Sequence, residues 1–431
     1  MYLAIDFGST CFKAAVFNAD LARRGHGAYR LRYQYPVPGH VELPVREVAD
    51  GIRACLAQAL AAAGPAARSI RAIAVTSQAQ TFTIADRAGT PRMPFISWQD
   101  TRAAETCDAM KRQPEWRTFR EHCSFGQLIP ALQVCLLRHM QTREKTERDP
   151  RDRLMPLSSY AVWLLSGQYC LDRNLAAMHG LYSLASRDWW ADALAACGLA
   201  RRQLPRLHEA GAAAAMTSAA AEAFGLPREI PIVLAGNDQT AGAYGAGLHE
   251  TEAALLTLGT AYVVYAVRRT LPRAAKESVR GSYPGGRYYR LAADSSGGNV
   301  IAWATHRLME RPDYDAFFET ARRAPAARNG LVFQPGAAGS AGEWRHIRPR
   351  HTKADLAASV LDALAARVRR MVHRVNGRGA KMLLAGGGGS AQPAWLEWLA
   401  DALGMPVVRT EADALLGAAR MAREAVGEND E

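Results

Sequence analysis

The pattern of apolar and polar positions in the first eighty residues predicts a hairpin, a helix and a buried strand. Residues 2–7, YLAIDF, form a short apolar run, and residues 11–17, CFKAAVF, alternate back after the small turn GST, which is typical of a β-hairpin. Residues 47–63 repeat their apolar positions with a helical period and are rich in alanine. Residues 70–78, IRAIAVTSQ, have the near-continuous apolar run of a strand that is covered on both faces.

The middle of the chain changes from a β-type to a helical pattern and back. Residues 81–98 predict a second hairpin with DRAGTP as its turn, and residues 103–210 have a mostly helical pattern. Residues 211–230 predict a loop and a helix, which lead into the strand PIVLAG at 231–236.

The second half of the chain also alternates strands with helices. Residues 253–267 predict a third hairpin, residues 354–376 a long helix, and residues 381–389, KMLLAGGGG, a strand that enters a glycine turn. A helix and a strand follow within residues 393–409. This alternation predicts an α/β fold.

The first and third hairpins share one layout, which predicts two related domains that face each other. LAIDFGSTCFKAAVF and ALLTLGTAYVVYAV each have an apolar strand, a turn of glycine and hydroxyl residues, and a second apolar strand. Such a turn can present backbone N–H groups to a phosphate. Each turn alone is more often an ordinary hairpin turn, but the third glycine turn at 386–389 favours the phosphate interpretation.

The composition is that of a globular protein with room for two domains. The chain has 431 residues, of which 49% are hydrophobic and 22% charged. No apolar run is long enough to span a bilayer, and the N-terminal segment lacks the features of a signal peptide, so we expect a cytoplasmic protein without membrane contact. The seven cysteines are odd in number and lack a CxxC spacing, which predicts reduced thiols.

The formal net charge of +12 raises the question of nucleic-acid binding. The basic residues are mostly arginines scattered along the chain, and they form no tract interleaved with aromatic residues. We therefore expect a solvated basic surface that attracts anionic substrates such as nucleotides, and no nucleic-acid partner.

Six motifs in order along the chain resemble those of the FGGY-type carbohydrate kinases, which belong to the actin/hexokinase/Hsp70 ATPase superfamily. One glycine-rich turn would be weak support, but six ordered motifs from residue 2 to about residue 421 are specific. The motifs are IDFGSTCFKAAVF, PFISWQDTRAAE, LLSGQYCLDRNLAAMHGLYSLASRDWW, AGNDQTAGAYGAG, TLGTAYVV, and LLAGGGGSAQPAWLEWLADALGMPVV followed by ADALLGAARMA.

The resemblance implies two ribonuclease-H-like (actin-like ATPase) domains with an interdomain cleft. Residues 1–247 would carry sugar binding, the first phosphate motif and the catalytic carboxylate, and residues 248–431 the second phosphate motif and the adenosine motif. The implied partners are ATP, Mg²⁺ and a small sugar or polyol, and a homodimer is left open. Domain closure would exclude water and limit wasteful hydrolysis of ATP.

Asp238 is the single carboxylate after the apolar strand that ends at Gly236. Judged from the residues alone, an acid at the start of the helical stretch NDQTAGAYGAG is more often a helix cap. By the resemblance it is the general base that draws the proton from the acceptor hydroxyl, and it contacts the acceptor.

The resemblance also assigns the metal and nucleotide residues. Asp6, at the end of the first strand, would hold Mg²⁺, with a turn-forming aspartate as the alternative. Lys13 could add positive charge, although such a lysine is more often only solvated. The remaining implied phosphate and adenosine contacts are Gly8, Ser9, Thr10, Gly259, Thr260, Gly387, Gly388 and Gly389.

The implied acceptor contacts follow the strand at 70–78 and lie in the segment around SWQDTR. They are Gln78, Gln80, Trp98, Asp100 and Arg102. An indole face suits the apolar side of a sugar, and amides and carboxylates suit its hydroxyls. Core packing of the Trp and a local ion pair of Asp100 with Arg102 are equally weighted alternatives.

The expected function is ATP-dependent phosphorylation of a small ketose or polyol, with a xylulose-like pentulose preferred. Ala79 and Gln80 match neither the Met-His pair of xylulokinases nor the Arg-Glu pair of glycerol kinases, and residues 335–351 replace a longer loop of the family. The alternative is an actin-like nucleotide-binding sensor or scaffold without kinase activity.

Overall fold

The chain divides into two units, and neither is a continuous stretch of sequence. The computed structural model describes residues 1–145, 149–249, 252–325, 330–336, 341–376 and 379–427. The first unit contains residues 1–245, 270–288 and 414–431, and the second contains residues 246–269 and 289–413. The C-terminal helix thus belongs to the first unit, whereas the functional division into 1–247 and 248–431 stays a prediction.

The first unit is built on a mixed six-stranded sheet. Its strands, in spatial order, are β13 (Ala213–Met216), β14 (Pro231–Asn237), β5 (Ala72–Ser77), β1 (Tyr2–Phe7), β2 (Cys11–Phe17) and β3 (Arg23–Arg30). β14, β5 and β1 are parallel neighbours, and the other adjacent pairs are antiparallel. The predicted hairpin of β1 and β2 and the predicted buried strand β5 are confirmed.

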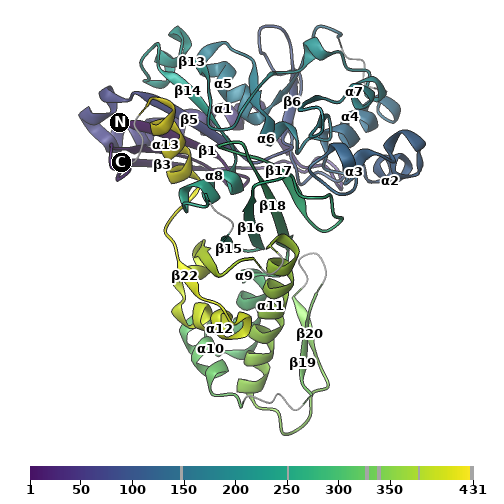
Figure 1. Cartoon of the computed structure of the whole chain (residues 1–431), viewed down its shortest axis with the longest axis vertical. Helices are drawn as coiled ribbons and strands as arrows, with labels where there is room; N and C mark the ends of the chain where they lie inside the picture. Colours follow the sequence, from purple (N-terminus) through teal and green to yellow (C-terminus); the bar gives the residue numbers. More distant parts are fainter. Residues whose placement is uncertain (146–148, 250–251, 326–329, 337–340, 377–378, 428–431) are drawn as a thin grey trace. The chain divides into compact units, whose positions relative to one another are not determined.

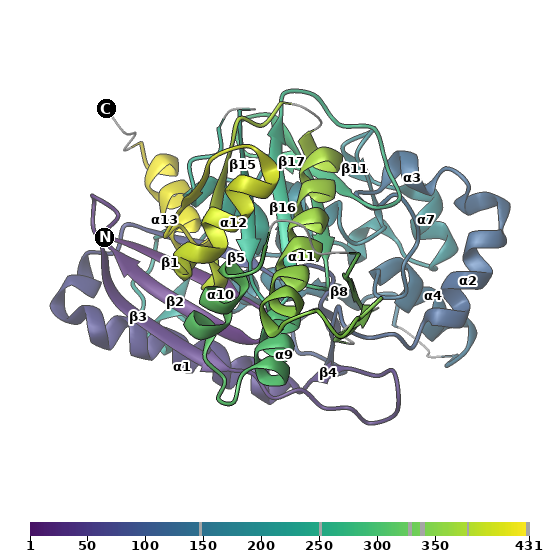
Figure 2. The same cartoon turned by 90° about the horizontal axis from the view of Figure 1, so that it is seen from below.

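Helices from both ends of the sequence pack on this sheet. Helix α1 (Val45–Ala63) lies along β3 (Figure 2) so closely that a Cβ atom on Gly27 would lie 2.1 Å from the carbonyl oxygen of Cys55. Helix α13 (Ala414–Ala425) packs on β1, β5 and β14 near the N-terminus (Figure 1). It also packs on α8 (Asp238–Gly245), the helix that follows β14.

Smaller elements complete the first unit. A second sheet has the order β4 (Glu42–Leu43), β7 (Phe95–Ile96), β6 (Phe82–Ala85) and β8 (Arg153–Pro156), and β6 and β7 form the predicted second hairpin. β9 (Cys170–Asp172) pairs with β12 (Arg206–His208), β10 (Tyr182–Ser183) pairs with β11 (Asp188–Trp189), and β17 (Val279–Tyr283) contacts α6. The remaining helices are α2 (Ala104–Arg112), α3 (Phe119–His122), α4 (Gln133–Thr142), α5 (Leu157–Ser166), α6 (Arg173–Ala176) and α7 (Ala191–Ala196), with short 3₁₀ turns η1 (Gly64–Ser69), η2 (Pro114–Trp116), η3 (Arg201–Gln203) and η4 (Ala219–Phe224).

Two segments of the first unit differ from the helical and loop patterns predicted for them. Residues 103–210 contain the short strands β8 to β12 beside their helices, and residues 211–230 form strand β13 and the 3₁₀ turn η4. β13 has the sequence AAAM, in which alanine has no strand preference, so its pairing with β14 determines the conformation.

The second unit repeats the α/β layout. Its strands lie in the order β18 (Arg287–Asp294), β16 (Tyr262–Arg268), β15 (Ala253–Leu258), β21 (Met382–Gly386) and β22 (Val407–Arg409). β15 and β16 form the third predicted hairpin, and β15 is parallel to β21 as β1 is parallel to β5. The α/β class and the shared hairpin layout of the two halves are therefore confirmed.

Four helices and a hairpin complete the second unit (Figure 1). They are α9 (Gly298–Leu308), α10 (Tyr314–Arg322), α11 (Lys353–Asn376) and α12 (Pro393–Leu403), with the 3₁₀ turn η5 (Gly388–Ala391) and the hairpin of β19 (Val332–Pro335) and β20 (Gly342–Arg345). The long helix predicted at 354–376 is α11. The shortened segment 335–351 includes β20, and its residues 337–340 lie outside the described residues.

Among the described residues, no helix has the length and apolar character needed to cross a membrane. All seven cysteines lie in the described part of the chain, where none forms a disulfide and six are buried.

Candidate active site

Three parallel strands bring the predicted residues Asp6, Gln78 and Asp238 to one edge of the first sheet. Asp6 is the penultimate residue of β1, Gln78 follows β5, and Asp238 follows β14. Because β14, β5 and β1 are adjacent and parallel, their carboxyl ends share an edge, which is where open α/β sheets bind ligands.

Asn237, and not Asp238, caps helix α8. The Asn237 side-chain oxygen accepts a hydrogen bond from the Thr240 N–H at 3.0 Å, the bond that a helix cap makes three residues ahead. Asp238 is the first helical residue, and one of its oxygens accepts from the Gln239 N–H at 2.8 Å. The alternative role considered for Asp238 is thus filled by its neighbour.

Asn174 and Gly236 fix the bend that presents Asp238. Gly236 has φ +73°, and a Cβ atom there would lie 3.1 Å from the Asn174 side-chain oxygen, so the bend favours glycine. The same oxygen accepts from the Asn237 N–H at 3.0 Å, while the Asn174 amide donates to the Thr240 hydroxyl at 2.9 Å. Asn174 was not among the predicted site residues, although it lies in the quoted motif segment CLDRN.

The surroundings of Asp238 make its carboxylate a stronger base. Burial raises the pKa of Asp238, while the Gln239 N–H and the Lys13 ammonium act in the opposite direction. Lys13 is exposed on β2, directly opposite Asp6 in the antiparallel register. Its position therefore brings positive charge to this edge of the sheet.

The turn at residues 8–10 is held through its carbonyl groups. The Tyr33 hydroxyl donates to the Ser9 carbonyl at 2.6 Å, the Gln78 amide to that of Gly8 at 3.3 Å, and the Leu31 N–H to that of Thr10 at 3.0 Å. The Gln78 side-chain oxygen accepts a hydrogen bond from the Thr81 hydroxyl at 3.1 Å, which fixes the amide that supports the turn. Contact of the turn with phosphate stays a prediction.

Gln80 and Trp98 lie in contrasting surroundings. Gln80 is buried and has a backbone φ of +62°. Its side-chain amide donates a hydrogen bond to the Met178 carbonyl at 3.2 Å, and its backbone carbonyl accepts one from the Gln133 side-chain amide at 3.3 Å. A left-handed backbone at a glutamine is uncommon and is often found at functional sites. The Trp98 side chain is 41% exposed, which excludes the alternative that it packs in the core.

Asp100 and Arg102 form the local ion pair that was weighed against sugar binding. Asp100 is fully buried, and its carboxylate accepts hydrogen bonds from the Arg102 guanidinium at 2.8 Å and from the Val41 N–H at 2.7 Å. Arg102 also pairs with Glu42 at 2.6 Å and Glu144 at 3.7 Å. The charges of both residues are used inside the fold, and we leave the pair out of the proposed acceptor site.

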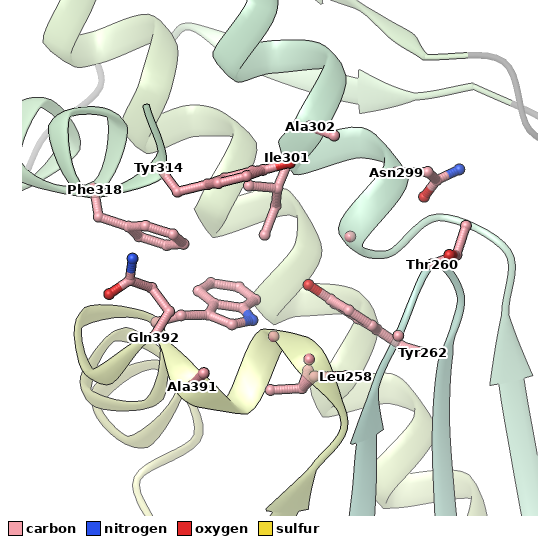
Figure 3. Close-up of a pocket in the computed structure, with 15 residues that line it drawn as sticks. Leu258, Thr260, Tyr262, Asn299, Ile301, Ala302, Tyr314, Phe318, Ala391 and Gln392 are labelled. Carbon is pink, nitrogen blue, oxygen red and sulfur yellow. The ribbon is translucent and has the colours of Figure 1, made fainter. Parts of the chain in front are cut away.

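A cavity in the second unit joins the two other glycine motifs. It has a volume of about 690 Å³. Its lining comprises Leu258, Gly259, Thr260, Tyr262, Gly298, Asn299, Ile301, Ala302, Tyr314, Phe318, Gly388, Gly389, Ala391, Gln392 and Trp395. Figure 3 shows Thr260 and Asn299 at one end of this cavity and the rings of Tyr314 and Phe318 at the other. One end is therefore polar, and the other presents aromatic rings with the Gln392 amide beside Phe318 (Figure 3).

The three glycines after β21 differ in what they contact. A Cβ atom on Gly387, which has φ +84°, would lie 2.9 Å from the Leu258 carbonyl oxygen, and one on Gly389 would lie 3.0 Å from the Leu258 Cβ. Gly388 has no atom within 4 Å of such a Cβ and lines the cavity. Gly387 does not line it, so close packing on β15 accounts for this glycine.

The turn at Gly259 and Thr260 is fixed by the start of helix α9. The Gly298 N–H donates to the Gly259 carbonyl at 3.0 Å, and the Asn299 N–H donates to the Thr260 carbonyl at 3.3 Å. These bonds hold the turn against the cavity wall. Asn299, Tyr314 and Phe318 were not predicted, because they come from α9 and α10, which are distant in sequence from the glycine turns. The other aromatic and amide residues of the wall, Tyr262, Gln392 and Trp395, lie close in sequence to the predicted Thr260 and Gly389 but were not predicted either.

The sequence matches two family models over nearly its whole length. The N-terminal domain of the FGGY family of carbohydrate kinases matches residues 1–245, and its C-terminal domain matches residues 254–425. Among curated relatives, a glycerol kinase of Alkalilimnicola ehrlichii is 29% identical over 99% of this chain and 90% of the relative. A xylulose kinase of Escherichia coli is 26% identical over 98% of this chain and 90% of the relative.

Solved structures have the same fold. A xylulose kinase of Rhodospirillum rubrum has a TM-score of 0.90 at 22% identity, covering 99% of this chain and 91% of that one. A Plasmodium falciparum glycerol kinase crystallised with ADP has a TM-score of 0.86 at 14% identity, covering 100% and 91%. The two actin-like ATPase domains expected from the sequence are thus confirmed as the fold class.

Proposed function

The chain belongs to the FGGY family of carbohydrate kinases and is therefore a phosphotransferase, and we propose that it transfers the γ-phosphate of ATP to a hydroxyl of a small neutral ketose or polyol, with Asp238 as the general base. The observation that carries this proposal is the division of tasks at α8. Asn237 caps the helix, so the Asp238 carboxylate can accept a proton.

Proton transfer to Asp238 follows from its surroundings. A sugar hydroxyl attacks phosphorus more readily as its proton moves to a base, and a raised pKa makes a carboxylate a better acceptor. Burial raises the pKa of Asp238, and Gly236 and Asn174 hold the backbone on which it stands.

The nucleotide is proposed to bind in the cavity of the second unit. Its aromatic end, with Tyr314, Phe318 and Trp395, suits a purine base, and its glycine turns suit phosphates because the backbone can approach closely. No charged side chain is among the described residues that line this cavity. Phosphate charge would then be balanced mainly by Mg²⁺.

The residues present fit a Mg²⁺ ion that arrives with the phosphates. The described residues contain no cluster of three metal-binding side chains, and Mg²⁺ bound with a nucleotide needs only one or two carboxylates. Asp6 supplies one at the end of β1, since its oxygens lie within 4.0 Å of the Cβ position of Gly8 in the turn. When bound, the ion would neutralise charge on the transferred phosphoryl group.

A neutral acceptor is favoured over a carboxylate-bearing one. Arg102, the cation of the predicted acceptor segment, is paired with Asp100, Glu42 and Glu144. Ala79 and Gln80 add no charge, and the exposed Trp98 offers an apolar face to a sugar. We keep a xylulose-like pentulose as the preferred acceptor, ahead of glycerol, and retain the cytoplasm as the expected location.

The acceptor class can be tested by ADP release with ATP and Mg²⁺ across pentuloses, hexuloses, tetritols, glycerol and gluconate, each also assayed with Asp238→Ala. We expect turnover with a neutral acceptor and none with gluconate. An actin-like sensor would bind ATP without acceptor-stimulated ADP release from any of them. Equal turnover in Asp238→Ala would contradict the assignment of the base.

A further inference from the structure

A second cavity in the first unit surrounds a motif that the proposed reaction does not use. It has a volume of about 540 Å³ and is lined by Arg173, Ser186, Arg187, Asp188, Trp189, Arg201, Leu204, Pro205, Arg206 and Leu207. Arg187, Asp188 and Trp189 are the Arg-Asp-Trp segment of the third sequence motif. The cavity is formed by α6, the loop before β11, the turn η3 and β12 (α6 in Figure 1, β11 in Figure 2).

Four arginines share this cavity with one lining carboxylate. Arg201 pairs with Asp188 at 2.7 Å, while Arg173 and Arg187 both pair with one oxygen of Glu209, at 2.9 and 2.7 Å. Arg206 forms no ion pair with any residue that the structure describes. Four cations against two carboxylates leave a net charge of +2 around the cavity.

Most guanidinium donors remain available after these pairs are made. Each guanidinium has five N–H groups, and the ion pairs engage one nitrogen each of Arg173, Arg187 and Arg201. The Arg173 Nε also donates to the Arg187 carbonyl at 3.2 Å, which ties two of the arginines together. Guanidinium groups held in this way suit bidentate recognition of phosphate oxygens.

The backbone at Arg187 is in an uncommon conformation. Its φ is +56°, the left-handed region that a residue with a Cβ rarely adopts. The turn between β10 and β11 could have used glycine there, yet the chain places a guanidinium at the cavity instead. Retained strain of this kind is found preferentially at ligand sites.

Apolar side chains share the lining of this cavity with the arginines. Trp189 is nearly buried and its indole N–H donates to the Pro205 carbonyl at 3.2 Å, so its ring is fixed beside Leu204 and Leu207. A cavity whose lining combines cations with apolar side chains matches a phosphate attached to an organic group. Its volume falls in the range of about 300–1,000 Å³ that small-molecule sites occupy.

We propose that this arginine cavity, lined by Arg173, Arg187, Arg201 and Arg206, binds a phosphate monoester. Two or more guanidinium groups hold the phosphate oxygens, and Trp189 and its neighbours contact the organic group. None of Asp6, Gln78 and Asp238 lines this cavity, and the proposal requires no assumption about the reaction assigned to them.

The test is isothermal titration of the full chain with phenyl phosphate and with inorganic phosphate, at constant ionic strength. The double variant Arg201→Ala/Arg206→Ala removes two exposed cavity arginines. The matched control is Arg202→Ala combined with Arg228→Ala, because both arginines are exposed and neither lines the cavity. Binding in the nucleotide cavity would be common to both proteins, so only their difference is interpreted.

We expect phenyl phosphate to bind the wild type and the control with equal affinity. It should bind the cavity variant at least about tenfold more weakly, because charge-assisted bonds to phosphate are lost. Inorganic phosphate should bind more weakly than the ester. Identical titrations of the cavity variant and the control would overturn the proposal. The arginines would then form surface ion pairs without a ligand-binding role. Phenyl phosphate that binds no tighter than inorganic phosphate would overturn the ester assignment.

Discussion

Asn237 and Asp238 divide two tasks that a single side chain at a helix start often combines. The Asn237 amide oxygen caps α8, and the Asp238 carboxylate stands one residue further with its pKa raised by burial. A carboxylate engaged in a cap is stabilised in its charged form and is a poorer proton acceptor. The pairing of Asn with Asp therefore fits a base that is placed by its neighbour.

Asp172 offers a pH-dependent test at the level of one residue. It is fully buried, caps α6 through the Leu175 N–H at 2.8 Å, and burial raises its pKa to about 6. An acid with a raised pKa in the folded state binds its proton more tightly there, so its contribution to stability is complete below about pH 4 and is lost as the pH rises to about 6.

Replacing Asp172 with Asn, which also caps helices, removes this titration. The free energy of unfolding of Asp172→Asn relative to wild type should increase from pH 4 to pH 7 by up to about 3 kcal/mol, measured by urea unfolding. The same substitution at Asp313, an exposed cap of α10 that accepts from the Ala316 N–H, is the control. A difference that is independent of pH would refute the buried titration.

Residue identities and the order of the motifs predicted candidate site residues, but they could not assign each role. Asn and Asp are both good helix caps, and only the backbone shows that Asn237 takes the cap position. Asn174 could not be selected, because its contact with Asn237 depends on a fold that joins residues 63 positions apart. The ion pair of Asp100 with Arg102 was an alternative to sugar binding, and the burial of Asp100 in the structure favours the ion pair.

At the scale of elements, the close packing of α13 on α8 holds the helix that begins at Asp238. A Cβ atom on Gly417 would lie 1.7 Å from the Ala241 carbonyl oxygen, so even one methyl group must separate the helices. We expect Gly417→Ala to lower the free energy of unfolding by about 1–3 kcal/mol, measured by chemical denaturation. Ala425→Val, at an exposed position on the same helix, should change it little. Equal stability of the two variants would contradict this packing.

Substitutions of the glycines after β21 can distinguish an effect on folding from an effect on the proposed nucleotide binding. Gly388→Val would project into the cavity and should weaken nucleotide binding about tenfold with unfolding unchanged, since nothing lies within 4 Å of its Cβ position. Gly387→Ala should instead destabilise the protein, because its φ is +84° and the Leu258 carbonyl lies 2.9 Å from the new atom. Fluorescent-nucleotide titration and thermal unfolding of both variants distinguish the effects, and an exchange of the two phenotypes would refute the assignment.

Elements with a strong period were predictable, and short paired strands were not. The α11 helix has a sustained apolar repeat, and the hairpins of β1–β2 and β15–β16 have clear turns. By contrast, β9 and β12 are three residues each and pair across more than thirty residues, so no local pattern specifies them. Of the lining of the cavity in the second unit, only Gly259, Thr260, Gly388 and Gly389 were predicted, because Tyr314, Phe318 and Trp395 meet through packing of α10 and α12.

At the scale of the whole molecule, the end of the chain completes the unit in which the chain begins. Helix α13 packs on β1, β5 and β14 as well as on α8, whereas the preceding residues 289–413 belong to the second unit. Removal of residues 414–431 should therefore destabilise the first unit selectively. Amide hydrogen exchange should show lost protection in β1, β5 and β14 and retained protection in β15 and β21.

Removal of residues 428–431 alone is the matched control, because it leaves every described contact of α13 in place. Its exchange pattern should equal that of the full chain. Loss of protection spread evenly over both units in the longer truncation would show that the units do not fold as separate cooperative blocks.

The most direct test of Asp238 as the general base is acceptor phosphorylation by Asp238→Asn, measured in single-turnover experiments with the neutral acceptor that the ADP-release screen identifies. The control is Asp20→Asn, the same substitution at an exposed loop position. We expect Asp238→Asn to lose at least about a hundredfold in rate while its nucleotide dissociation constant equals that of the wild type. Phosphorylation at near the wild-type rate would contradict the central claim that Asp238 is the base.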